Sequence, residues 1–332
     1  MIYNYAVVGA GAWGTALANM LAKTNNGKII IWAKETEVVD QINNENKNNL
    51  FLPSVNLEKN IEATNDINKV VAPHIFYVTP SQHFESILVS HKKVLNNNSQ
   101  IIICSKGIEI KNGFLLGDIY KNVFSNDNYL ILSGPSFANE VARYLPSALI
   151  LASEDIKSSI KLAKIISSRN FRLYVSDDVI GVQLGGAIKN IYAIGAGIVK
   201  GLNYGENARA AFLTRSIAEM VKICMVLGGK KESIFGLSGV GDIFLTCNSE
   251  NSRNFVLGRS IGKGLEIKNI ISENQTLAEG YYTSKALYFL LKNKKIDTPI
   301  MLGIYNILYR KFSIKEVVDS LLNRPLKTNE FD

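Results

Sequence analysis

Short apolar runs alternate with helical patterns along the first half of the chain. The runs lie at residues 5–8, 28–32, 75–78, 101–104, 129–132, 148–151 and 171–175. Helical patterns separate several of them, at residues 16–23, 81–95, 114–123 and 155–167. Strands that alternate with helices form parallel sheets, because each helix carries the chain back across the sheet. The pattern therefore predicts an α/β fold with a mostly parallel, doubly wound sheet.

Only helical patterns follow residue 177. They cover residues 181–200, 207–227, 276–291, 299–309 and 314–321. A chain of 332 residues is also long for a single core, so two domains are expected. We expect residues 1–176 to form the sheet domain and residues 177–332 to form an all-helical domain.

A glycine-rich turn joins the first predicted strand to the first predicted helix. Residues 9–15 read Gly-Ala-Gly-Ala-Trp-Gly-Thr. In a βαβ unit Gly9 permits the tight turn, Gly11 lets a pyrophosphate approach the backbone, and Gly14 lets helix and strand pack closely. The unpaired N–H groups of the helix then face the phosphates. Residues 1–176 are therefore predicted to be a dinucleotide-binding Rossmann domain.

The end of the second predicted strand bears on the choice of cofactor. An acidic residue there would bind the ribose 2′-hydroxyl of NAD. Here Lys34 comes first and is suited to the 2′-phosphate of NADP, while Glu35 fits the first turn of the next helix. The order favours NADPH and leaves NADH as the alternative.

Composition and charge narrow the range of partners. The chain is 47% apolar and 20% charged, which is typical of a soluble globular protein, and its net charge of +8 favours an anionic partner. A dense basic run with interleaved aromatic residues is lacking, which argues against nucleic-acid binding. The chain starts without a signal-peptide pattern and has no uninterrupted apolar stretch of about 18 residues, so we expect a cytoplasmic protein that does not insert into membranes.

Cysteine and histidine residues show no metal-ligand spacing. The cysteines are far apart in sequence and form no CxxC pair, and the histidines are not joined by further ligands. We therefore expect reduced thiols and no bound metal. The residues concerned are Cys104, Cys224, Cys247, His74, His83 and His91.

The predicted helix at residues 181–200 contains five glycines and one central charge, Lys189. A glycine inside a helix costs about 1 kcal/mol relative to alanine, so the small residues should serve a purpose. Steps of four from Lys189 reach only Gly181, Gly185, Ala193 and Gly197, which share its face. Burial would lower the pKa of Lys189 and make it a candidate catalytic group. The alternative is a tight helix–helix contact with a lysine that extends to water.

Polar clusters follow three of the predicted strands, at residues 79–81, 105–109 and 133–137. Ligands of doubly wound sheets bind outside the carboxyl ends of the strands. Lys106 is the only charge directly after its strand, which makes it a second candidate; the alternative is a solvated loop lysine.

Two loops of the helical half carry further candidates. Asp242 follows two glycines and is suited to cap a helix or to orient a lysine. Ser252, Arg253 and Asn254 precede a helical pattern at residues 255–261, and these groups at a helix N-terminus suit a phosphate. The alternative for this cluster is a capped surface helix with an unrelated arginine.

Seven sequence blocks resemble the motifs of bacterial NAD(P)-dependent glycerol-3-phosphate dehydrogenase and occur in the same order. They cover residues 9–17, 105–109, 134–138, 181–197, 239–242, 252–254 and 278–280. The resemblance implies a homodimeric cytosolic enzyme that interconverts dihydroxyacetone phosphate and sn-glycerol 3-phosphate for phospholipid synthesis. Lys34 departs from the family, where an arginine is common, and so do Ser54 after Pro53 and Tyr281.

The resemblance also implies roles for individual residues. Lys189 would transfer the proton, with Lys106 lowering its pKa and Asp242 orienting an ammonium or hydroxyl group. The substrate contacts implied are Lys106, Gly134, Ser136, Lys189, Asp242, Ser252, Arg253 and Asn254. The cofactor contacts implied are Ala12, Trp13, Lys106, Ala138, Arg253 and Glu279, beside Gly9, Gly11, Gly14 and Lys34.

Two other functions remain open on the sequence. One is a different two-domain reductase with a helical second domain, although a phosphate site at residues 252–254 argues against a substrate that lacks phosphate. The other is a protein that senses NAD(P) without catalysis, which would have no need of Lys106, Lys189 and Asp242 together.

Overall fold

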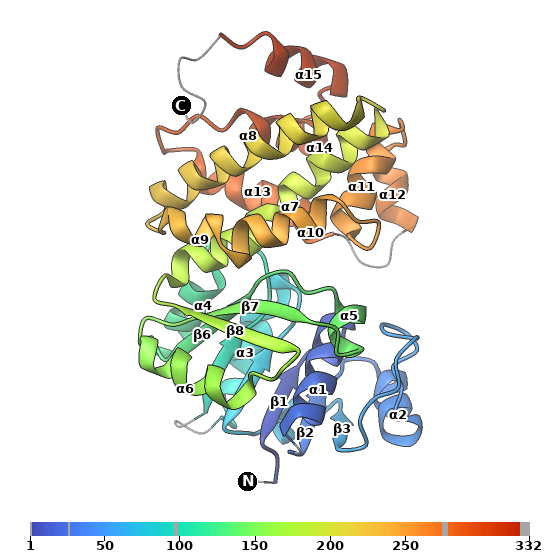
Figure 1. Cartoon of the computed structure of the whole chain (residues 1–332), viewed down its shortest axis with the longest axis vertical. Helices are drawn as coiled ribbons and strands as arrows, with labels where there is room; N and C mark the ends of the chain where they lie inside the picture. The colour runs from blue at the N-terminus through green and yellow to red at the C-terminus, as the bar shows by residue number, and fades with distance from the viewer. Residues whose placement is uncertain (1, 26, 96–98, 274–277, 326–332) are drawn as a thin grey trace. The chain divides into compact units, whose positions relative to one another are not determined.

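The computed structural model describes residues 2–25, 27–95, 99–273 and 278–325, and the chain divides into two compact units (Figure 1). The first unit comprises Met1–Lys106 and Leu115–Val179. The second comprises Gly107–Phe114 and Ile180–Asp332. The apolar pattern gives no indication that residues 107–114, which follow a strand of the first unit, group with the helices of the second.

The first unit is built on an eight-stranded sheet in the order β3-β2-β1-β4-β5-β6-β7-β8. All neighbouring strands are parallel except β6 and β7, which confirms the predicted α/β class. The strands are β1 (Tyr5–Val8), β2 (Ile29–Trp32), β3 (Ile61–Thr64), β4 (His74–Tyr77), β5 (Gln100–Ile103), β6 (Tyr129–Ser133), β7 (Ser147–Ala152) and β8 (Phe171–Ser176). The strand order reverses direction between β1 and β4, and a ligand of such a sheet binds at that point.

Helices cover both faces of this sheet because alternate strand residues point to opposite sides. Val7, Ile31 and Phe76 share one apolar core with residues of α1 and α2. On the other face, Tyr77 packs edge-on against Phe84 of α3. The helices are α1 (Ala12–Asn25), α2 (Thr36–Glu45), α3 (Phe84–Lys92), α4 (Leu116–Phe124), α5 (Ala138–Ala142) and α6 (Ile156–Ile166), with short 3₁₀ turns η1 (Ile67–Lys69) and η2 (Ser81–His83).

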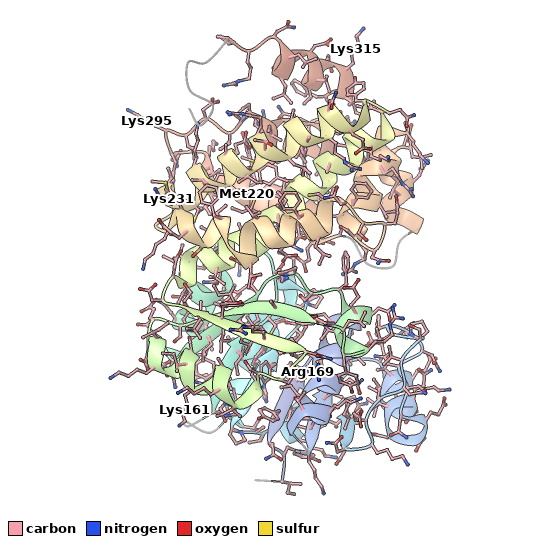
Figure 2. The ribbon with its side chains drawn as sticks, viewed as in Figure 1. Lys161, Arg169, Met220, Lys231, Lys295 and Lys315 are labelled. Atoms are coloured by element: carbon pink, nitrogen blue, oxygen red, sulfur yellow. The ribbon has the colours of Figure 1, made fainter. Side chains whose placement is uncertain are left out.

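From Ile180 onward, the described part of the second unit consists of helices and the loops between them. Its elements are α7 (Val179–Gly201), α8 (Gly205–Val226), α9 (Lys231–Phe235), the π-helical η3 (Leu237–Gly241), α10 (Asp242–Cys247), α11 (Arg253–Gly262), α12 (Ile267–Glu273), α13 (Glu279–Leu291), α14 (Pro299–Tyr309) and α15 (Ile314–Leu322). The helix predicted at 276–291 begins outside the described residues. Figure 2 shows Met220 among the packed side chains of this unit, whereas Lys231 and Lys315 lie at its edges.

Helix α7 is the core of this second unit. It is long and apolar enough to cross a membrane, but 89% of its most apolar window is buried inside the protein. The glycines on its surface admit neighbouring backbone. A Cβ atom at Gly185 would lie 2.8 Å from the carbonyl oxygen of Ser238, and one at Gly197 would collide with the backbone of α11. The row of small residues therefore serves close helix packing at both ends of the turn that carries Lys189.

A buried carboxylate joins α7 to two other helices. Glu219 of α8 accepts hydrogen bonds from the Tyr192 hydroxyl of α7 at 2.8 Å and from the backbone N–H groups of Ile300 and Met301 at 2.6 and 2.9 Å. These N–H groups belong to the first turn of α14, which has no intrahelical partner for them. Burial raises the pKa of Glu219 to about 7, and Asp297 adds to the rise, while the three hydrogen bonds oppose it.

This pKa predicts a pH-dependent stability. The carboxyl group titrates near 4.5 in an unfolded chain and near 7 in the folded protein, so the folded state binds more protons between these values. The free energy of unfolding should therefore fall as the pH rises from about 4.5 to about 7, by roughly 3 kcal/mol from this group, and then level off. Denaturant unfolding of Glu219→Gln across this window should lack that fall. An identical pH slope in both proteins would contradict the assignment.

Candidate active site

The glycine turn between β1 and α1 has the geometry that a bound pyrophosphate needs. Gly9 adopts a φ of +116°, and a Cβ atom there would lie 2.9 Å from the carbonyl oxygen of Val78. A Cβ atom at Gly14 would collide with the backbone of Gly9, so α1 starts in direct contact with the turn. At Gly11 no atom lies within 4 Å of the Cβ position, which leaves the backbone and the N-terminus of α1 open to a ligand.

Unpaired polar atoms lie near the same edge of the sheet. The Trp13 indole N–H, the Thr79 hydroxyl and the Ser133 hydroxyl are buried without a hydrogen-bond partner. Trp13 is in the first turn of α1, Thr79 follows β4, and Ser133 ends β6, so all three are near carboxyl ends of parallel strands. Buried polar groups without partners are costly, and a polar ligand would relieve that cost. These residues fit a dinucleotide.

Asn48 supports the glycine turn from a loop that the sequence indicated only as polar. Its buried amide donates to the carbonyl oxygen of Ala10 at 2.9 Å and to the hydroxyl of Thr15 at 2.8 Å. The Thr15 hydroxyl itself donates to Ala10. The turn is thus held rigid from outside the βαβ unit, and no local sequence signal identifies Asn48.

The other residues assigned to the cofactor start helices or follow strands. Lys34 is exposed two residues after the end of β2, and Glu35 is the N-cap residue of α2 without a capping side-chain bond. Ala12 and Ala138 are the first residues of α1 and α5, two helices that pack against each other. Glu279 is the first residue of α13 in the second unit.

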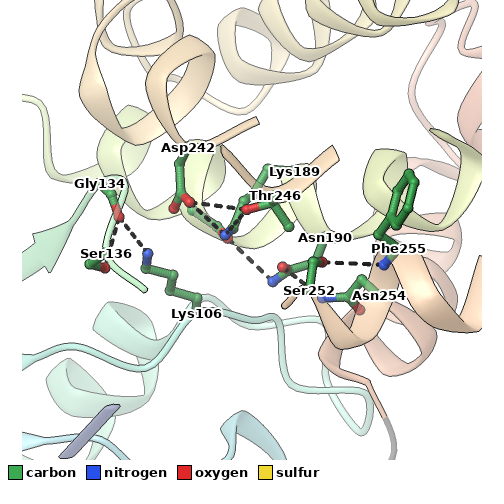
Figure 3. A network of polar contacts seen from close by, with 11 residues as sticks. Lys106, Gly134, Ser136, Lys189, Asn190, Asp242, Thr246, Ser252, Asn254 and Phe255 are labelled. Atoms are coloured by element: carbon green, nitrogen blue, oxygen red, sulfur yellow. Dashed lines mark hydrogen bonds and ion pairs between the residues drawn. The ribbon is translucent and has the colours of Figure 1, made fainter. Parts of the chain in front are cut away.

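Lys106 is half-buried and is bound to the loop after β6. Its ammonium group donates to the carbonyl oxygen of Gly134 at 2.8 Å, and the Ser136 hydroxyl donates to the same oxygen at 3.0 Å (Figure 3). Gly134 adopts a φ of +128°, which other residues rarely adopt, and its Cβ position is 3.1 Å from the Leu149 backbone. Three residues predicted from two separate blocks of sequence therefore lie together.

Lys189 is buried and contacts a carboxylate and a hydroxyl. Its ammonium group lies 2.6 Å from Asp242 Oδ1 and 2.6 Å from Thr246 Oγ1, and the Thr246 hydroxyl donates to Asp242 at 3.2 Å (Figure 3). Lys189 is 7% and Asp242 1% exposed, so this ion pair is almost dry. Asp242 starts α10 and Thr246 lies one turn later, so both face α7. The side chain therefore does not extend to water.

Two opposing effects act on the charge of Lys189. Burial disfavours an ammonium ion, whereas a carboxylate in contact stabilises it. The predicted influence of Lys106 on Lys189 involves both units and stays a prediction. The neighbouring thiol does not compete for the proton, because burial raises the pKa of Cys247 well above its usual range.

The phosphate candidates lie at the N-terminus of α11. The Ser252 side chain caps the helix by accepting from the Phe255 N–H at 3.2 Å, and Arg253 is exposed at the first helical position. Asn254 turns inward instead. Its amide donates to Asn190 Oδ1 at 2.9 Å and its oxygen accepts from the Gly280 N–H at 2.9 Å.

The Asn254 contacts link α11 to α7 and α13. Asn190 was not predicted, although a second polar residue beside Lys189 in an apolar helix was a usable signal. Thr246, which is 57 residues from Lys189 in sequence, was not predicted either.

Comparisons with known proteins agree over nearly the whole chain. The family model described as the NAD-dependent glycerol-3-phosphate dehydrogenase N-terminus matches residues 4–159, and the C-terminus model of that family matches residues 178–319. The glycerol-3-phosphate dehydrogenase (NAD(P)+) of Novosphingobium aromaticivorans is 41% identical over 98% of both chains. The enzyme of the same name from Rhodospirillum rubrum is 37% identical over 98% of this chain and 94% of its own.

Solved structures give the same result. The glycerol-3-phosphate dehydrogenase of Coxiella burnetii superposes with a TM-score of 0.92 at 35% identity, covering 97% of this chain and 99% of its own. A D-mandelate dehydrogenase bound to NADH, at 15% identity and a TM-score of 0.62, shares the fold alone.

Proposed function

Because the chain belongs to the NAD-dependent glycerol-3-phosphate dehydrogenase family, we propose that Lys189 transfers the proton in the reaction of that family. The protein is an NAD(P)-dependent oxidoreductase that reduces dihydroxyacetone phosphate to glycerol 3-phosphate. The observation that carries the proposal is the buried contact of Lys189 with Asp242 and Thr246. This contact fixes an ammonium donor in a nearly dry setting.

The proposed chemistry of the chain concerns one proton and one developing charge. When bound, the nicotinamide cofactor supplies a hydride to the carbonyl carbon of the ketone. Lys189 donates a proton to the oxygen that becomes negative, and it accepts that proton in the reverse direction. Asp242 and Thr246 orient its ammonium group by their hydrogen bonds. Lys106, with Gly134 and Ser136, adds a positive charge and polar groups for the substrate.

We place the substrate phosphate at the N-terminus of α11. Arg253 supplies a guanidinium group, and the Ser252 hydroxyl can still donate while its oxygen caps the helix. Asn254 has two of its bonds committed to Asn190 and Gly280, so its main task here is to hold this N-terminus in place. Binding energy from a remote phosphate positions the reacting carbonyl.

The cofactor is NAD(P)(H), and its proposed contacts lie in the glycine turn and near the helix starts described above. We propose a preference for NADPH because exposed Lys34 follows β2 with no acidic residue before it. Lys34→Ala should weaken NADPH binding more than NADH binding, by about 1–2 kcal/mol for an exposed charged contact. Dissociation constants of both cofactors measure this effect.

Lys28→Ala is the matched control, since Lys28 is also exposed but precedes β2. It should leave both dissociation constants unchanged. Equal losses of NADPH and NADH in Lys34→Ala would contradict the proposed preference.

Three further properties are proposed from the family resemblance. We propose a homodimer, a cytoplasmic location and a role in supplying glycerol 3-phosphate for phospholipid synthesis. No nucleic-acid partner and no membrane insertion are proposed.

One experiment separates this function from its two rivals. NADPH oxidation is measured with dihydroxyacetone phosphate, with an unphosphorylated 2-keto acid, and with no ketone. We expect turnover with the phosphate alone. Turnover of the keto acid instead would indicate another reductase, and binding of NADPH without any turnover would indicate a sensor.

A further inference from the structure

Tyr192 connects the helix of Lys189 to the interior of the second unit. It lies three residues after Lys189 on α7 and is 0% exposed, and its hydroxyl donates to Glu219 at 2.8 Å. Glu219, 5% exposed, is fixed in turn by the first backbone N–H groups of α14. A single carboxylate therefore ties α7, α8 and α14 together at one point.

The apolar contacts around this point define the rotation of α7 less sharply than a hydrogen bond does. A Cβ atom at Gly195 would meet Phe212 of α8 and Ile304 of α14, so the three helices approach closely at a residue without a side chain. Apolar packing of this kind is non-directional, whereas a hydrogen bond has a preferred distance and angle. The Tyr192–Glu219 bond is therefore suited to set how far α7 is rotated about its axis.

The rotation of α7 matters for Lys189 because its partners lie on a different element. Asp242 and Thr246 belong to α10, and both contacts with the ammonium group are 2.6 Å long. A small rotation of α7 would lengthen them and move the proton donor. Building on the proposed role of Lys189, we propose that Glu219 is a positioning residue for proton transfer, acting through Tyr192. Glu219 itself touches neither substrate nor cofactor in this scheme.

Tyr192→Phe tests the inference, because it removes one hydroxyl and leaves the ring and both Glu219–α14 bonds in place. We expect kcat to fall roughly tenfold, below the about 10²-fold loss that a 1 Å misplacement can cause. The KM for NADPH should stay unchanged, since the glycine turn lies in the other unit. The KM for dihydroxyacetone phosphate should change less than kcat, because α7 reaches the phosphate residues through the Asn190–Asn254 bond and not through Lys189. The pH profile of kcat should shift, because the proton donor is held differently.

Ser216→Ala is the matched control. The Ser216 hydroxyl is buried on α8, one turn before Glu219, and donates at 2.7 Å to the carbonyl of Phe212 within that helix. Its loss should lower the melting temperature without changing kcat or the pH profile. Should Tyr192→Phe be too unstable to assay, Glu219→Gln carries the same expectation for kcat.

A double-mutant cycle tests whether Tyr192 and Glu219 act through their shared hydrogen bond. Glu219→Gln combined with Tyr192→Phe should lower kcat no further than Glu219→Gln alone. Lys189→Met is assayed beside these variants. If Lys189→Met is inactive while Tyr192→Phe retains the parental kcat and pH profile, the positioning role is wrong and the proposed function stands. An active Lys189→Met variant overturns both the positioning role and the proposed role of Lys189. A loss of kcat in Ser216→Ala equal to that in Tyr192→Phe overturns the positioning role.

Discussion

Replacing Lys189 by methionine is expected to lower kcat by about 10²–10⁴, the usual contribution of a positioned general acid or base. Methionine has nearly the length of the lysine stem, so the packing of α7 against its neighbours should survive. Steady-state NADPH oxidation with saturating dihydroxyacetone phosphate measures the loss. The dissociation constant of NADPH should change little, because the glycine turn lies in the other unit and is untouched.

The melting temperature of Lys189→Met provides a control for the predicted loss of kcat. Removing the lysine takes away the cation of Asp242, which is 1% exposed, and losing one member of a buried ion pair is costly. Lys189→Met should therefore melt at a lower temperature than the parent. Lys189→Met combined with Asp242→Asn removes both charges and should recover stability but not kcat. A single variant that keeps its kcat would contradict the catalytic assignment, whatever its melting temperature.

The sequence predicted those features of the fold that depend on neighbouring residues. The alternating apolar runs led to the parallel sheet, and the glycine spacing led to the turn, because Gly9 and Gly14 meet local steric demands. Strand β3 was missed because an exposed glutamate interrupts the apolar run of Ile61–Thr64. The grouping of Gly107–Phe114 with the second unit has no local signal either, since it depends on contacts far along the chain.

The residues of the candidate site also divide into those with a local sequence signal and those without one. Lys189 stood out because it is the one central charge of an apolar stretch, and Asp242 stood out because it follows glycines. Their contact spans 53 residues of sequence, so it was one of two readings of Asp242 until the structure placed them 2.6 Å apart. Thr246 has ordinary local surroundings, and Asn190 is marked only by its place beside Lys189 in an apolar helix. Only the arrangement of α7, α10 and α11 makes them partners of predicted residues.

Arg253→Ala is expected to raise the KM for dihydroxyacetone phosphate by roughly 10- to 100-fold, since hydrogen bonds to charged groups contribute about 1.5–3 kcal/mol. The guanidinium side chain starts α11 and is exposed, so its removal should leave the fold intact. Arg259→Ala is the matched control on the same helix, because that guanidinium is paired with Glu250 at 2.8 Å. Its KM should stay near the parental value.

Unphosphorylated dihydroxyacetone tests whether the binding energy lost in Arg253→Ala came from contact with the substrate phosphate. This ketone should be a poor substrate for the parent and for Arg253→Ala alike, because neither can gain from a phosphate that is absent. The ratio of kcat/KM for the phosphorylated and unphosphorylated ketones should therefore shrink in the variant. Arg253→Lys keeps the charge but loses the bidentate hydrogen bonding of guanidinium. Its ratio of kcat/KM values should therefore lie between those of the parent and Arg253→Ala. An alanine variant with the full parental ratio would show that the phosphate binds elsewhere than at the N-terminus of α11.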